Sequence, residues 1–101
     1  MGRLTVLTCA TEAGGATNLV PIVKRFSGVA NFQVYCDRGG RVIFDRAGIT
    51  TNTCELVTSE ITASEYLEAV DPNVVLLGRG INLDSSERHF TSSARHLNIP
   101  T

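Results

Sequence analysis

The sequence has no long hydrophobic run, no cluster of one charge and few cysteines. No apolar run approaches the roughly 18 residues that indicate a membrane-spanning helix, and the N-terminus lacks the pattern of a signal peptide. Nine basic residues against ten acidic ones leave a net charge of −1, without the basic patch that nucleic-acid binding usually requires. We therefore expect a cytoplasmic protein with no membrane span and no nucleic-acid partner.

The cysteines and histidines do not form a pattern of crosslinks or metal ligands. Cys9, Cys36 and Cys54 are odd in number and none belongs to a C-x-x-C pair, which argues against a disulfide framework and against a zinc site. His89 and His96 share one face of an expected helix without a third ligand, so we interpret them as surface residues. The sequence thus predicts neither a metal nor a cofactor.

What the sequence does contain is a regular alternation of strand and helix signals. The chain has 101 residues, 43% of them hydrophobic, which is typical of a single globular domain. Apolar runs predict the strands, and apolar residues at helical spacing predict the helices between them. The predicted strands cover residues 4–9, 31–36, 53–57 and 73–77, and the predicted helices begin after Asn18, at 41, at 62 and at 84.

Strands that alternate with helices imply a parallel sheet with right-handed crossovers. We therefore predict an α/β fold, a Rossmann-like three-layer sandwich with four strands in the order 3-2-1-4. Residues 98–101 (NIPT) follow the last predicted helix as a short turn of the kind that leads into a fifth strand. Without that strand, the run 73–77 would be an uncovered apolar edge, which natural proteins usually protect. We expect one half of a larger two-domain protein, or a chain completed by a homo-oligomer partner.

The most informative stretch lies between the first strand and the first helix. If Asn18 caps that helix, Pro21 falls in its first turn, where proline is tolerated, and a long loop runs from Ala10 to Thr17. This loop would lie at the carboxyl end of the first strand, where open α/β sheets bind ligands at the switch in strand order. We therefore expect the loop to face a ligand.

Two specific interpretations of this loop fit the residues poorly. A dinucleotide fingerprint would need three glycines, and Cys9-Ala-Thr-Glu-Ala-Gly-Gly15 keeps only the last of them, although Asp37 stands where a ribose-binding acid would lie. Cys9 at a strand end resembles the phosphocysteine loop of sugar-phosphotransferase IIB domains, in which loop amides hold a phosphate. The charge of Glu12 opposes that chemistry, and a small buried thiol is the alternative interpretation of Cys9.

Two longer stretches together resemble one family. The segment 10–26 (ATEAGGATNLVPIVKRF) is similar to the first loop and helix of the N-terminal domain of GT-B glycosyltransferases and UDP-N-acetylglucosamine 2-epimerases. The segment 71–101 (DPNVVLLGRGINLDSSERHFTSSARHLNIPT) resembles their fourth strand–helix unit. The resemblance implies two Rossmann-like domains that face a cleft, with the acceptor held mostly by the N-terminal domain and the nucleotide-sugar mostly by the other.

The resemblance also implies a site. Glu12 would be the general base or the acceptor of a sugar hydroxyl, and Gly14 and Gly15 would let backbone amides approach a sugar or diphosphate. The opposite wall would consist of Gly78, Arg79, Gly80 and Asn82. We expect an acceptor-side domain of a transferase that is inactive alone and binds a sugar or nucleotide-sugar. The alternative is a stand-alone nucleotide-binding, phosphate-binding or phosphocysteine carrier module, completed by oligomerisation.

Overall fold

A computed structural model describes residues 4–36, 38–53, 59–78 and 86–101 of the chain. Strands and helices alternate along the whole sequence, as the apolar pattern predicts. The elements are β1 (Leu4–Ala10), α1 (Ala13–Phe26), β2 (Ala30–Cys36), α2 (Arg38–Arg46), β3 (Asn52–Thr53), α3 (Glu60–Val70), β4 (Val74–Leu77) and α4 (Ser86–His96).

The strands form a parallel sheet in the order β3-β2-β1-β4. Its body consists of β2, β1 and β4, because β1 pairs with β2 along its whole length and with β4 from Val6 to Cys9. The strand predicted over 53–57 is described only as the two-residue β3, and residues 54–58 lie outside the described residues. The predicted α/β fold with a parallel sheet is confirmed.

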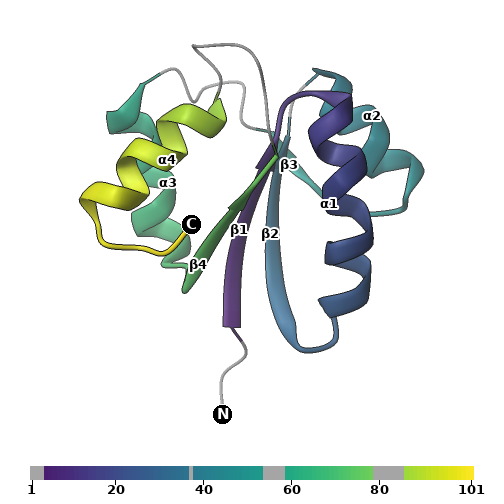
Figure 1. Cartoon of the computed structure of the whole chain (residues 1–101), viewed down its shortest axis with the longest axis horizontal. Coiled ribbons are helices and arrows are strands. Elements are labelled where there is room, and N and C mark those ends of the chain that lie inside the picture. The colour runs from purple at the N-terminus through teal and green to yellow at the C-terminus, as the bar shows by residue number, and fades with distance from the viewer. Residues whose placement is uncertain (1–3, 37, 54–58, 79–85) are drawn as a thin grey trace.

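Helices cover both faces of this sheet. Figure 1 shows α1 and α2 on one side, which we call the α1/α2 face, and α3 and α4 on the other, the α3/α4 face. Side chains of the central strand β1 alternate between them, with Leu7 and Cys9 in the α3/α4 core and Ala10 in the α1/α2 core. A strand buried on both faces explains the nearly continuous apolar run of β1.

The first helix begins earlier in the chain than the position of Pro21 predicts. The structure places the helix start at Ala13, and Pro21 lies inside the helix. Gly15, Ala16, Leu19 and Val23 are buried along one stripe of α1, so packing decides the start. Thr17, whose carbonyl loses its helical donor at Pro21, is exposed, and water can supply that hydrogen bond. The prediction of an N-cap at Asn18 is therefore wrong.

The other helix boundaries differ less. The third helix begins at Glu60 instead of residue 62, and its N-cap is Ser59, whose hydroxyl accepts a hydrogen bond from the Thr62 amide at 3.2 Å. The second helix begins at Arg38 instead of residue 41, and Gly48 follows its end with a φ of 76°, which favours glycine. None of the described helices is long and apolar enough to span a membrane.

The amino-end half of the α1/α2 face is incompletely covered. A hollow of about 340 Å³ lies between α1 and the edge strand β4, and its lining is apolar. The side chains of Phe26 and Val29 at this hollow are 44% and 66% exposed. On the outer edge of β4, the Val75 amide donates to the Pro100 carbonyl at 2.8 Å, so the C-terminal residues lie against that edge.

Candidate functional site

The connection from β1 to α1 is a tight turn of two residues, Thr11 and Glu12. The long loop predicted from Ala10 to Thr17 is therefore wrong, because α1 already begins at Ala13. Gly14 and Gly15 lie in the first turn of this helix, where backbone N–H groups have no intrahelical acceptor. The predicted ligand-facing segment is thus the N-terminal turn of a helix at the carboxyl edge of the sheet.

This turn lies at the switch in strand order. From β1 the chain proceeds outward to β2 and β3, and then returns to place β4 on the other side of β1. Gly78 follows β4, and its amide donates to the Cys9 carbonyl at 2.8 Å. The carboxyl ends of β1 and β4 therefore meet where open α/β sheets bind their ligands.

The two predicted walls of the site touch each other. A Cβ atom built on Gly78 would lie 3.0 Å from the Gly15 Cα and 3.0 Å from the Ala10 Cβ, tighter than most real contacts, so these neighbours would have to give by a few tenths of an ångström. Glycine at position 78 is what allows β4 to approach α1 this closely. Since both glycines are buried, the described residues that a ligand can reach here are those of the outer rim, where Gly14 is exposed and Glu12 half-exposed.

The second helix also approaches the turn. The Gly40 amide donates to the Thr11 carbonyl at 3.3 Å, and a Cβ atom at Gly40 would overlap the Ala10 carbonyl oxygen. A Cβ atom at Gly39 would lie 3.3 Å from the Ala13 nitrogen. The N-termini of α1 and α2 therefore adjoin at this edge, and their partial positive charges favour an anion there.

Glu12 is the N-cap residue of α1, with an extended backbone (φ −113°, ψ 151°). Its side chain accepts no capping hydrogen bond from the first turn of the helix, whereas its carbonyl accepts one from the Ala16 amide at 3.1 Å. A carboxylate at a helix N-terminus is stabilised by the helix dipole. The Glu12 side chain can therefore accept a hydrogen bond from a ligand hydroxyl without giving up a cap.

Glu87 is a functional candidate that the sequence analysis did not identify. Its side chain is 5% exposed, in the first turn of α4. One carboxylate oxygen accepts from the Thr11 hydroxyl at 2.8 Å and the other from the Thr11 amide at 3.3 Å. The sequence does contain a signal for it: Glu87 shares the spacing i, i+3, i+7 with the buried Phe90 and Ala94, which places its carboxylate on the inward face of the helix.

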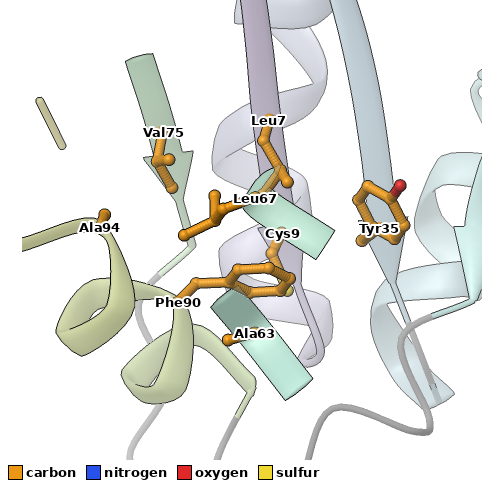
Figure 2. Packing of buried hydrophobic residues seen from close by; sticks show 8 residues of the cluster. All are labelled: Leu7, Cys9, Tyr35, Ala63, Leu67, Val75, Phe90 and Ala94. Carbon is orange, nitrogen blue, oxygen red and sulfur yellow. The ribbon is translucent and has the colours of Figure 1, made fainter. Parts of the chain in front are cut away.

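Cys9 lies in the core and not at the rim. Its side chain is 0% exposed and packs with Ala63, Leu67 and Phe90 on the α3/α4 face, as Figure 2 shows. The interpretation as a small buried thiol is confirmed. A phosphoryl donor cannot reach this sulfur without opening the core, which disfavours the phosphocysteine interpretation.

The remaining predictions concern the histidines, which are not expected to bind a metal, and four further ligand contacts. The side chain of His96 is 83% exposed and lies 3.8 Å from a Glu60 oxygen, and no group of three or more His, Cys, Asp or Glu among the described residues could hold a metal ion. Four predicted ligand contacts lie outside the described residues: Asp37, Arg79, Gly80 and Asn82.

No protein-family model fits the sequence, and no curated protein is similar to it at a significant level. The chemistry of the carboxyl edge is therefore the basis for a functional assignment.

Proposed function

We propose that this chain is the acceptor-side, Rossmann-like domain of a GT-B-type sugar-nucleotide enzyme, with its ligand at the carboxyl edge of the sheet. One observation carries the proposal. The first turn of α1, with its donor amides and the Glu12 carboxylate, lies at the switch point between β1 and β4. Backbone amides at a helix N-terminus can donate to a diphosphate, and a carboxylate can accept from a sugar hydroxyl, so the two groups suit different parts of a phosphorylated sugar.

In this proposal Glu12 is the general base or hydroxyl acceptor, and the exposed Gly14 amide is a donor to the ligand. The resemblance of the sequence to GT-B proteins adds Arg79, Gly80 and Asn82 as further contacts. Asp37 is a further candidate because it stands where a ribose-binding acid would lie, and the strand predicted over 53–57 would be the fourth full strand of the sheet. The same resemblance implies that transfer occurs in a cleft between two domains. The partner is then a C-terminal domain or a second copy, the setting is cytoplasmic, and the 101-residue chain alone transfers no sugar.

Titration followed by amide NMR tests the ligand. We expect N-acetylglucosamine and UDP-N-acetylglucosamine to shift the amide signals of Glu12 and Gly14, and to leave unchanged that of Gly28, which lies beyond the far end of α1. Glu12→Gln weakens these shifts, whereas the control Glu68→Gln, at an exposed position on α3, does not. Unchanged Glu12 and Gly14 signals at millimolar ligand would disprove the proposal. Shifts with inorganic phosphate but none with N-acetylglucosamine would instead support a phosphate-binding module.

Incubation of the chain with a UDP-sugar and candidate acceptors tests the second part of the proposal. We expect no sugar transfer by mass spectrometry, because most nucleotide contacts belong to the other half of such an enzyme. Measurable transfer by the chain alone would show that the proposed division into two halves is wrong.

A further inference from the structure

We propose that Glu87 is the positioning residue of this edge: from α4, its carboxylate fixes Thr11 and thereby sets the place of the Glu12 carboxylate and the Gly14 amide. The consequence for ligand binding rests on the proposed function. The positioning itself does not, because it can be measured on the free protein.

The burial of Glu87 requires partners for its charge. A carboxylate taken out of water is unfavourable unless hydrogen bonds replace its hydration. Both side-chain oxygens of Glu87 accept from a single residue, Thr11, one from the hydroxyl and one from the amide. Hydrogen bonds to a charged acceptor are the stronger kind, and the position in the first turn of α4 further favours the charge.

Thr11 is held from both faces of the sheet. Its amide and hydroxyl donate to Glu87 of α4, while its carbonyl accepts from the Gly40 amide of α2. These two helices lie on opposite faces, as Figure 1 shows. Because the turn has only Thr11 and Glu12, the orientation of the Thr11 peptide decides where Glu12 and the start of α1 lie.

The same hydrogen bonds link the segments that follow β1 and β4, the two strands of the switch point. Thr11 follows β1, and Glu87 lies in the helix that follows β4. These residues are 76 positions apart in sequence, so the hydrogen bonds couple two segments that are otherwise linked through the sheet. A displacement of α4 therefore changes the turn, and a ligand bound at the turn restrains α4.

The experiment uses the full chain and four single variants. Glu87→Gln removes the charge and keeps one accepting oxygen, while its NH2 group cannot accept from the Thr11 amide and can pair with the Thr11 hydroxyl only by donating to it. Thr11→Val removes the hydroxyl but keeps the amide bond, and Thr11→Ser keeps both donors. Thr91→Val is the matched control, since the Thr91 hydroxyl donates to the backbone carbonyl of Glu87 within α4 and leaves the carboxylate alone.

Hydrogen exchange of the Thr11 amide is the first readout. We expect exchange of the residue-11 amide to be roughly tenfold faster in Glu87→Gln, which replaces the charged acceptor of this amide by a neutral one. A smaller acceleration is expected in Thr11→Val, which keeps the amide bond but loses the hydroxyl bond that holds the carboxylate in place. The Gly14 amide signal should shift in the same two variants. Thr11→Ser should restore both properties, and Thr91→Val should leave both at their wild-type values even if it lowers the unfolding midpoint. The double variant Thr11→Val with Glu87→Gln should not exceed Glu87→Gln substantially.

Equal exchange of the Thr11 amide in the wild type, Glu87→Gln and Thr11→Val would overturn the proposal. Should Glu87→Gln fail to fold, the shift of the Gly14 amide signal in Thr11→Val decides, because this variant keeps the Glu87 carboxylate and its bond to the residue-11 amide and loses only the hydroxyl bond. Titration with N-acetylglucosamine and inorganic phosphate separates positioning from function. If the variants move the turn but the chain binds neither probe, the positioning role is supported and the proposed function is disproved. Wild-type binding that Glu87→Gln weakens at least several-fold supports both.

Discussion

The two faces of the sheet are built in different ways. On the α3/α4 face, three aromatic rings pack together: the Tyr35 and Tyr66 centroids are 5.1 Å apart, and Phe90 lies within 6.3 Å of both. On the α1/α2 face, the contact with the sheet at the carboxyl edge uses small residues, Ala10, Gly15 and Gly78. Large interlocking side chains stabilise the first face, whereas close backbone approach on the second creates the turn where the candidate site lies.

On the α1/α2 face, a buried polar group lacks a described hydrogen-bond partner and an apolar side chain remains partly exposed. The Thr8 hydroxyl on β1 is fully buried and has no hydrogen-bond partner among the described residues. Toward the amino ends of the strands, the hollow beside β4 leaves Phe26 on α1 44% exposed. Both faces have a buried core, since Phe44 is fully buried on the α1/α2 face. That face differs in leaving the Thr8 hydroxyl without a described partner and the hollow beside β4 unfilled.

The largest expected effect is the removal of an aromatic ring from the α3/α4 face. Phe90→Ala should lower the free energy of unfolding by about 3–5 kcal/mol, because Phe90 is fully buried and leaves a cavity. The control Phe26→Ala on the other face should cost no more than about 1 kcal/mol, since the ring is nearly half-exposed. Urea unfolding measures both, and similar losses would show that the Phe26 ring is as well buried in solution as the Phe90 ring.

The next effect concerns the close approach at the carboxyl edge. Gly78→Ala should lower the free energy of unfolding by about 1–3 kcal/mol, because the added methyl must push Gly15 or Ala10 aside. Gly14→Ala should instead raise it by up to about 1 kcal/mol, since alanine favours a helix and no described atom lies within 4 Å of its Cβ. If Gly78→Ala is tolerated as well as Gly14→Ala, the two walls do not touch in solution.

The sequence predicts the sheet better than the site, for physical reasons. Buried strands carry apolar runs, so β1, β2 and β4 agree with the predicted ranges within one residue at each end. The predicted start of α1 is wrong because Pro21 is typical of a first helical turn, whereas burial of the stripe from Gly15 to Val23 decides where this helix begins. The hydrogen bonds between Thr11 and Glu87 join residues that are far apart in sequence, and no local pattern determines which distant side chain meets a turn.

A smaller effect should come from the unsatisfied hydroxyl on the α1/α2 face. Thr8→Val replaces a buried hydroxyl without a described partner by a methyl group of similar shape, which should stabilise the protein by about 1 kcal/mol. The midpoint of urea unfolding should rise with an unchanged slope. A loss of stability would mean that the hydroxyl is satisfied in solution, and the α1/α2 face would then be as well satisfied as the other.

The smallest effect appears only at alkaline pH, on the α3/α4 face. Burial raises the pKa of Tyr35 above its ordinary value, and the neighbouring Tyr66 raises it further. The folded protein therefore holds the Tyr35 proton more tightly than the unfolded chain does. The stability that follows is fully present below pH 10 or so, the ordinary pKa of tyrosine, and falls as the pH rises toward the raised pKa.

Tyr35→Phe removes this titration and keeps the ring. The free energy of unfolding, measured in urea between pH 8 and 11, should decline less steeply above about pH 10 in the variant than in the wild type. All other titrating groups are shared, so the difference between the two curves isolates Tyr35. Parallel curves would mean that water reaches the phenol in the folded state, and that the aromatic cluster packs less tightly than its ring distances indicate.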